Sequence, residues 1–506
     1  MVSLTAPRML SVATPRSRQQ VPILYIVLAL CLLFMFLQIE FRTMVVVDER
    51  IADTEQQPPP PLPLVITSPS QTPTPTPSPT PRPTPKYKPQ PEWTPPAIKD
   101  PFPLLSSGMP PPVPAWNKAK KPNVYHEYSL SKAPPLLIGF TRGWPMLLQT
   151  VVGYITAGWP ADQIYVVENT GAHDANAMGR LSLQNPLYLN YTQLHMLGVH
   201  VTRTPVLLSF AQLQNYFTTV AREEPWSYYF WGHMDSFVLS YEDGMEGVTG
   251  AVGTPGYQTI YELAIGELND TMRSDHRWGA RFFANDRLTL VNPRAYGDVG
   301  GFDTLIPYDM SGCDMYWRLE EAGWSVKDVQ AGIVQDVGSV LDDLRVLYRE
   351  SEVPEDFGFT DPNPPPPPPP TKVMGESVRE ENKRSLPVPE LDRTGAPVDS
   401  ETGDSPEDAA KAVDPLDSFR VLRRIGQDMF DHKHADRDRD TWQLGQRGGD
   451  PHEPYAYDAL GFQEGIDIMT EAGREIFRRK WGHRDCDLGA AGLRPSEAWK
   501  VEKDWE

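Results

Sequence analysis

The sequence contains little cysteine, and its charge is strongly weighted to one sign. Only three of its 506 residues are cysteines, which excludes a disulfide-stapled scaffold and a zinc site built from four cysteines. Its 47 Lys and Arg residues face 67 Asp and Glu residues, giving a net charge of −20. Because binding to nucleic acid needs a basic face, this acidity argues against a nucleic-acid partner. An ordinary apolar core must therefore stabilise the folded part.

Two glycine-rich nucleotide motifs are also missing. Neither Gly-x-Gly-x-x-Gly nor a P-loop lysine motif follows the first predicted strand at residues 135–140. The usual dinucleotide and P-loop sites are therefore excluded. Any nucleotide site in this chain must be of another kind.

Long apolar runs are limited to one, at residues 21–37. At about 1.5 Å per residue it crosses most of a bilayer's hydrocarbon layer. We predict a retained signal anchor at residues 21–38 behind a cytosolic tail at residues 1–20; a cleaved signal peptide is the alternative. Arginines precede the run and most of the nearby acids follow it, which predicts a single-pass type II protein with its bulk in the lumen. The short span favours the Golgi membrane, with the endoplasmic reticulum second.

Clustered proline divides the rest of the chain. Residues 58–114 contain 23 of the 54 prolines, so we expect no packed core there and predict an extended stalk at residues 39–118. A second proline-rich, acidic stretch at residues 351–415 predicts a disordered insert. Between them we expect a catalytic domain at residues 119–350. A C-terminal segment at residues 416–506 is apolar enough to pack on it.

Several residues fit a lumenal location. Asn190 and Asn269 each begin an Asn-x-Thr glycosylation signal. Cys313 and Cys486 are able to pair in an oxidising lumen, the alternative being two separate buried thiols.

A segment around His432 and His434 is rich in Asp and Arg and is predicted to lie on the surface.

Alternating apolar runs and amphipathic stretches indicate an α/β fold. Strand, helix and strand are predicted at residues 135–140, 144–157 and 163–167, and the theme recurs at 199–202, 210–221 and 227–231. This alternation predicts a mostly parallel sheet covered on both faces. Ligands of such sheets bind at the carboxyl ends of the strands. The polar residues at those ends are Thr141, Arg142, Glu168, Asn169, His233 and Asp235.

The segment at residues 228–239, YYFWGHMDSFVL, resembles the metal motif of the nucleotide-sugar-dependent GT-A glycosyltransferases, in particular the family-2-like enzymes. In that family an apolar strand ends in Asp-x-Asp, whereas this chain has His233-Met234-Asp235. The resemblance implies a Rossmann-like nucleotide-diphospho-sugar transferase domain. It also implies a divalent cation that His233 and Asp235 hold on the donor diphosphate. An imidazole ligand favours Mn²⁺ over Mg²⁺.

A second match lies at residues 299–324. Gly300-Gly301-Phe302-Asp303 resembles the family's Gly-Gly-Phe-Asp turn, and residues 313–319 resemble the helix that follows it. The glycines let backbone approach the sugar closely, which implies donor contacts for Gly300 and Gly301. Ser311 and Gly312 stand where the family has its Glu-Asp pair. The base that accepts the acceptor proton is therefore expected among Asp314, Asp309 and Asp303.

The same resemblance implies roles for further residues at the edge of the sheet where the nucleotide-sugar donor is expected to bind, which we call the donor edge. Glu168 takes the place of an acid that contacts the base or ribose, and Thr141 and Arg142 are candidates for the nucleotide pocket. A late histidine often completes the metal site in such enzymes. His483 is the candidate here, with a solvated histidine as the alternative.

Together these features predict a metal-dependent glycosyltransferase of the hexosyltransferase type. It would move a sugar from a nucleoside diphosphate sugar to a glycan, glycoprotein or glycolipid acceptor with inversion. The missing acids in both motifs leave a second interpretation open, a catalytically inactive GT-A fold that serves an active transferase as a membrane-anchored partner. A purely structural anchored glycoprotein is the third.

Overall fold

A computed structural model describes residues 84–89, 97–106, 108–360, 415–435, 446, 450, 452–455 and 458–505. The predicted cytosolic tail, the membrane anchor, most of the stalk and most of the insert lie outside these residues. No described helix is both long and apolar enough to cross a bilayer. The chain divides into two units, residues 1–88 and 89–506, and every element below belongs to the second.

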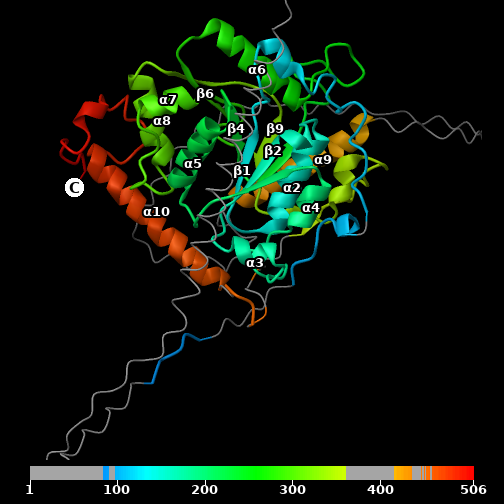
Figure 1. Cartoon of the computed structure of the whole chain (residues 1–506), viewed down its shortest axis with the longest axis horizontal. Coiled ribbons are helices and arrows are strands. Elements are labelled where there is room, and N and C mark those ends of the chain that lie inside the picture. The colour runs from blue at the N-terminus through cyan, green and yellow to red at the C-terminus, as the bar shows by residue number, and fades with distance from the viewer. Residues whose placement is uncertain are drawn as a thin grey trace, which may run out of the picture. The chain divides into compact units, whose positions relative to one another are not determined.

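A seven-stranded sheet forms the centre of this unit, in the order β3-β2-β1-β4-β7-β6-β8 (Figure 1). Neighbouring strands are parallel except for β7, which runs antiparallel to both β4 and β6. The predicted mostly parallel α/β sheet is thereby confirmed. The strands of this sheet are β1 (Leu136–Phe140), β2 (Ile164–Glu168), β3 (His200–Arg203), β4 (Tyr229–Gly232), β6 (Trp278–Phe282), β7 (Leu288–Val291) and β8 (Ser325–Asp328).

Two short antiparallel ribbons accompany the sheet. β5 (Ser236–Leu239) pairs with β9 (Ile333–Asp336), and β10 (Val340–Leu341) pairs with β11 (Phe359–Thr360). The first ribbon brings Ser236 opposite Asp336. It therefore places residues about 100 positions apart next to the end of β4.

Helices cover both faces of the sheet because successive side chains of its strands point to opposite sides. In β1, Leu136 and Ile138 enter one apolar core and Leu137 enters the other. The first core includes α2, α6 and α9, and the second includes α5, α7 and α8. The α-helices among the described residues are α2 (Trp144–Thr156), α3 (His173–Ala177), α4 (Tyr191–Met196), α5 (Phe210–Glu223), α6 (Ile260–Ser274), α7 (Pro293–Asp298), α8 (Ser311–Glu321), α9 (Pro415–Ala435) and α10 (Ala459–Trp481).

Local sequence explains where the main surface helices begin. Ser209 and Gln212 form a capping box at the start of α5, and Thr259 and Glu262 form one at the start of α6. Each box satisfies backbone N–H groups that have no partner within the helix. The helices therefore start at fixed residues and hold their apolar faces against the sheet.

The end of the predicted stalk belongs to the folded unit. The Phe102 side chain is fully buried, Leu105 is nearly so, and the Leu344 N–H donates to the Pro101 carbonyl oxygen at 2.9 Å. Asn117 is also fully buried and donates to Glu242. The expectation of no packed core up to residue 114 is wrong for this stretch. A few apolar side chains among the prolines are enough to dock an extended segment on an existing core.

The predicted insert also begins too early. Val353 is buried, and β11 lies at residues 359–360 within the expected insert of residues 351–415. The structure describes the chain again from α9, which starts at Pro415. The folded part described before α9 therefore extends to Thr360.

The C-terminal segment packs on the domain of the seven-stranded sheet at two places. In α9, Phe419, Leu422, Ile425 and Met429 form a buried stripe. Gly426 lies within the same helix, where an added Cβ would come within 2.5 Å of the Phe237 ring. Glycine therefore lets α9 approach the β5–β9 ribbon closely.

The second helix of this segment, α10, lies beside α8 (Figure 1). Phe477 and Trp481 of α10 are fully buried in an apolar cluster with Ile306. A disulfide bond joins Cys313 of α8 to Cys486, across 173 residues of sequence. The pairing that the sequence left open is therefore present.

Candidate functional site

The polar residues that follow β1, β2 and β4 lie at one edge of the sheet. The strand register sets Phe140 beside Glu168 and Ile138 beside Gly232. Thr141 and Asn169 follow these strands, and the Asn169 amide lies 3.4 Å from the Thr141 hydroxyl. The edge that sequence analysis selected is therefore formed by the residues expected there.

Glu168 is buried at this edge, with 1% of its surface exposed. One carboxylate oxygen accepts hydrogen bonds from the Thr170 hydroxyl at 3.0 Å and the Asn176 amide at 2.8 Å. The other accepts from the Tyr191 hydroxyl. Burial, followed by this hydrogen bond, raises the pKa of Tyr191, so Tyr191 stays a donor. Hydrogen bonds from other side chains of the protein thus occupy both carboxylate oxygens of Glu168.

Arg142, after β1, is covered by the start of α10. Its guanidinium donates to the Gln463 side chain at 2.8 Å and lies 4.6 Å from the centre of the Phe462 ring. A guanidinium against an aromatic face is a favourable cation–π contact. The C-terminal segment thereby reaches the donor edge predicted from sequence.

The His233–Asp235 turn after β4 is fixed from α2. The Thr150 hydroxyl lies 2.7 Å from the Met234 carbonyl oxygen and accepts the Ser236 N–H at 3.0 Å. His233 Nδ1 lies 3.8 Å from an Asp235 carboxylate oxygen. The two predicted metal ligands are therefore neighbours in space.

Asp235 is already paired with a cation. The Lys433 ammonium group, from α9, donates to Asp235 Oδ2 at 2.9 Å and to Asp336 Oδ1 at 2.6 Å. Burial by itself raises the pKa of Asp235, but the charges of Lys433, His233 and Arg287 hold it well below its usual value. Asp235 is therefore ionised throughout the physiological range.

Asp336 receives two further partners. Arg287 lies 3.0 Å from Asp336 Oδ1, and His434 Nε2 lies 3.0 Å from Asp336 Oδ2. Burial, together with the charges of Arg287 and Lys433, lowers the pKa of His434, although Asp336 opposes the shift. We call Asp235, Asp336, Lys433, Arg287 and His434 the Asp235 cluster. It contains two carboxylates and two permanent cations, so its formal charge with neutral His434 is zero.

One buried nitrogen beside this cluster has no hydrogen-bond partner among the described residues. It is His233 Nε2. The ring of His233 leans against Trp231, with 5.2 Å between ring centres, and against Phe210. Buried polar atoms of native proteins nearly always have a partner. This nitrogen therefore marks a place where a ligand atom would be stabilised.

The predicted base Asp314 is fully buried in an ion network. Lys480 donates to its Oδ1 at 2.6 Å, Trp481 donates to the same oxygen at 3.1 Å, and Arg318 donates to Oδ2 at 2.9 Å. These contacts join α8 to α10. An enclosed carboxylate held by three donors is not open to an acceptor hydroxyl, so its geometry is that of a structural group.

Asp303 and Asp309, the other candidates for the base, differ in their surroundings. Asp303 accepts from Lys480 at 2.7 Å. Burial by itself raises its pKa, but Lys480 and the Leu305 N–H bring it below its usual value. Asp309 pairs with Arg474, and 39% of its side chain is exposed. Asp309 is thus the more open of the two.

The Gly300-Gly301 turn is tied to its surroundings by backbone contacts. Both residues have positive φ, 83° and 74°, a conformation that favours glycine. The Asn215 amide donates to the Phe302 carbonyl oxygen at 2.9 Å, and Arg318 donates to the Gly301 carbonyl oxygen at 2.7 Å. A Cβ at Gly301 would lie 2.5 Å from Asn215 Oδ1. The turn is therefore explained by packing without any ligand.

His483 lies in a charged loop that follows α10. Its Nε2 pairs with Asp487 at 2.8 Å and its Nδ1 pairs with Asp504. Burial by itself lowers the pKa of His483, but the two carboxylates raise it above the usual 6.5. Among the described residues, the ion-pair partners of His483 are Asp487 and Asp504, and neither belongs to the Asp235 cluster. A protonated imidazole is a donor and not a metal ligand.

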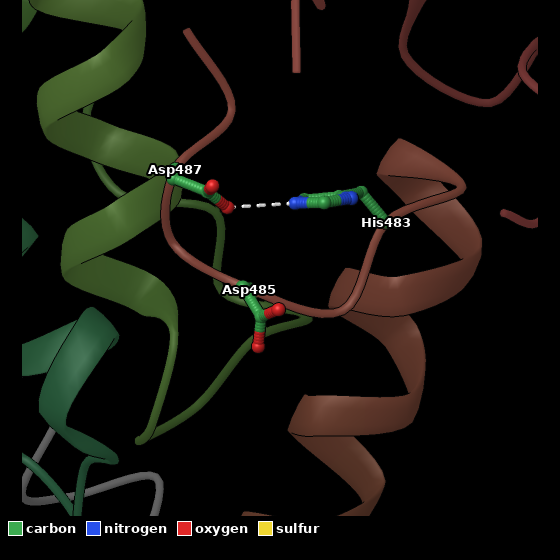
Figure 2. A group of neighbouring side chains, drawn as sticks. All are labelled: His483, Asp485 and Asp487. Atoms are coloured by element: carbon green, nitrogen blue, oxygen red, sulfur yellow. Dashed lines mark hydrogen bonds and ion pairs between the residues drawn. The ribbon is translucent and has the colours of Figure 1, made fainter. Parts of the chain in front are cut away.

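Figure 2 shows His483 with the two acids nearest to it along the loop. Potential ligand atoms of His483, Asp485 and Asp487 lie within 4.8 Å of one another. Both acids are exposed, and both ring nitrogens already have carboxylate partners. The group is therefore interpreted as a surface ion pair.

Sequence analysis missed Lys433, Asp336 and Arg287. The segment around His432 and His434 lies at the surface as predicted, but Lys433 between them is buried. The sequence pattern that could have revealed Lys433 is the apolar stripe of α9. Lys433 follows Met429 by four residues and so continues the apolar face of the helix. A lysine at such a position needs a buried acid as its partner.

Comparisons with known proteins give partial matches of structure only. No family model and no curated protein sequence matches the chain. A mannosyltransferase, PcManGT, from Pyrobaculum calidifontis in complex with GDP-Man and Mn²⁺ matches at 13% identity and a TM-score of 0.26, over 41% of this chain and 62% of that one. This chain thus spans about three fifths of that mannosyltransferase.

Two further solved structures show the same kind of partial likeness. GalNAc-T7 with UDP, GalNAc and Mn²⁺ matches at 13% identity and a TM-score of 0.26, over 40% of this chain and 43% of that one. A cytidylyltransferase from Leptospira borgpetersenii serovar Hardjo-bovis matches at 8% identity and a TM-score of 0.23, over 39% and 75%. Identities and TM-scores this low do not assign a function to this chain.

We expect Asp314→Asn to destabilise the fold strongly. The substitution leaves Lys480 and Arg318 without their buried counter-charge, and breaking such a pair costs about 3–5 kcal/mol. The matched variant Asp309→Asn, at an exposed ion pair, should cost less than about 1 kcal/mol because solvent screens it. Denaturant unfolding of both variants measures this difference. Equal, small effects would contradict the structural role of Asp314.

The contribution of His483 to stability should depend on pH. Since its folded pKa is raised, its ion pairs stabilise the protein fully below about pH 6.5. The contribution is lost as pH rises through the folded pKa. His483→Gln should therefore lower the melting temperature more at pH 5.5 than at pH 8.5. The same measurement on His276→Gln, at an exposed turn, is the control; an effect of equal size at both pH values would refute the ion-pair assignment.

Proposed function

We propose that this protein is a GT-A glycosyltransferase that moves a sugar from a nucleoside diphosphate sugar to a glycan, glycoprotein or glycolipid. The observation that carries the proposal is the buried, unpartnered His233 Nε2. It lies beside Asp235, at the carboxyl end of β4, where the sequence resembles a donor-binding motif. Carboxyl ends of parallel strands are the usual ligand edge of such sheets.

The residues along this edge have separate roles in the proposal. His233 and Asp235 face the donor diphosphate, and Thr141 and Arg142 line the nucleotide. Glu168 orders the nucleotide pocket through its bonds to Asn176 and Tyr191. Gly300 and Gly301 shape the turn on the sugar side.

Asp309 is our choice for the base, because it is more exposed than Asp303 and Asp314. Arg474, its partner, lies on α10, the helix that also contacts Arg142. In the inverting reaction the acceptor oxygen attacks the anomeric carbon as the bond to the diphosphate oxygen breaks. The acceptor proton passes to the carboxylate, and the nucleoside diphosphate leaves.

Sequence resemblance implies a divalent cation, Mn²⁺, at this edge, and imidazole with carboxylate is a suitable ligand set. The pairing of Asp235 with Lys433 weighs against it.

The donor assignment is tested on the purified full-length chain with a panel of UDP- and GDP-sugars and mixed glycan acceptors. Nucleotide release should appear with one donor and fall at least about 100-fold in Asp235→Asn, as for the loss of one group that stabilises the departing charge. Asp328→Asn, at the exposed end of β8, is the control and should keep full activity. Absence of both release and nucleotide binding would reject the proposal.

A second candidate function is an inactive GT-A fold that assists an active transferase. The burial of Asp314 and the pairing of Asp235 favour it, because neither acid is free for chemistry. Binding of a nucleoside diphosphate without any turnover, across the whole donor panel, would support this candidate over the first.

We further propose that the protein is a type II protein of the Golgi membrane with its folded unit in the lumen. The Cys313–Cys486 bond supports this placement, because structural disulfides form and persist in oxidising compartments. In sealed vesicles, protease should remove an N-terminal tag and leave the folded unit intact. Asn269 is half-exposed, and Asn269→Gln should reduce the endoglycosidase-sensitive mass shift by one glycan. A folded unit that protease degrades in intact vesicles would contradict the topology.

A further inference from the structure

The Asp235 cluster places a lysine where the sequence resemblance expects a metal ion. Lys433 Nζ lies 2.9 Å from Asp235 Oδ2, 2.6 Å from Asp336 Oδ1 and 3.4 Å from the Val337 carbonyl oxygen. An ammonium group has three N–H donors, and here each faces an oxygen. The lysine is therefore fully satisfied at this position.

A divalent cation does not fit between the same two carboxylates while Lys433 is there. An ion that bridges Asp235 Oδ2 and Asp336 Oδ1 at bonding distances of about 2.0–2.6 Å must occupy the volume of the lysine nitrogen. It would also face the Arg287 guanidinium, which lies 3.0 Å from Asp336 Oδ1. Both contact and charge repulsion oppose the ion.

Packing fixes Lys433 in this place. Only 3% of its side chain is exposed. It follows Met429 on the buried stripe of α9, and Gly426 allows that helix to lie directly against Phe237 of β5. Withdrawing the ammonium group would leave two partly or fully buried carboxylates without their nearest cation, which is costly.

The charge balance of the cluster suits an anionic ligand. Two carboxylates alone would repel a diphosphate, and a metal ion is one way to cancel that repulsion. Here Lys433 and Arg287 cancel the charges of Asp235 and Asp336. The edge beside His233 is therefore neutral before any ligand arrives.

We infer that Lys433 takes the place of the divalent cation at this donor edge, so that the protein binds its nucleoside diphosphate donor without a metal ion. Lys433 acts through Asp235 and Asp336 and is a positioning residue. The role as donor edge rests on the proposed function, whereas the exclusion of metal rests on the cluster alone.

The first test measures Mn²⁺ binding to the metal-stripped full-length chain through the loss of the free-ion EPR signal. Wild type and Asp235→Asn should bind Mn²⁺ equally weakly. Lys433→Met, whose uncharged side chain is one atom shorter and leaves the place of the ammonium nitrogen open, should gain one equivalent of bound Mn²⁺. That gain should vanish in the double variant with Asp235→Asn.

Controls separate this site from the exposed loop at His483. Weak binding that Asp485→Asn removes, and Asp235→Asn does not, belongs to that loop and agrees with the inference. One equivalent bound to wild type and lost in Asp235→Asn overturns it. This comparison needs no Lys433 variant, so the test holds even where Lys433→Met fails to fold.

The second test measures affinity for nucleoside diphosphates by calorimetry, in EDTA and in Mn²⁺. Wild-type affinity should differ by less than about twofold between the two conditions. In EDTA, Lys433→Met should bind at least tenfold more weakly, and Mn²⁺ should restore its affinity. A wild-type affinity that falls tenfold or more in EDTA overturns the inference. Failure of every nucleotide to bind rejects the donor site and leaves the Mn²⁺ result to decide the metal question.

Discussion

The need of buried carboxylates for a cation determines how this structure is assembled. Asp314 is fully buried and Asp235 largely so, and each receives a lysine from the C-terminal segment, Lys480 and Lys433 respectively. An ionised acid removed from water is stable only when it is paired and hydrogen-bonded. The domain of the seven-stranded sheet is therefore incomplete by itself, and the two C-terminal helices complete its charge balance as well as its core.

The same constraint connects the fold with the proposed chemistry. Asp235 lies three residues after the end of β4, and Asp314 lies in the first turn of α8, which follows the Gly300-Gly301 turn. Because α9 and α10 contact these two places separately, the positions of both motifs depend on the C-terminal segment.

Sequence alone predicted the mostly parallel sheet and the polar residues at its strand ends, because strand periodicity and strand-end polar residues are local patterns. The His233–Asp235 turn was found in this way, whereas the Gly300-Gly301 turn was found through the family resemblance. Lys433 and Lys480 were not connected with their acids, since the contacts cross 198 and 177 residues of sequence. The docking of Phe102 was missed because proline content conceals a few apolar anchors, and composition does not show where a core has room for them.

The disulfide between Cys313 and Cys486 is a second covalent connection between the sheet domain and the C-terminal segment. The chain between Thr360 and Pro415 is the link through which backbone bonds connect the sheet to α9 and α10. If a lumenal protease cut that link, the two pieces would still be one covalent molecule under oxidising conditions. On a denaturing gel such a nicked protein would run as a single species without reductant and as two with it, so limited cleavage there would go unnoticed unless the sample were reduced.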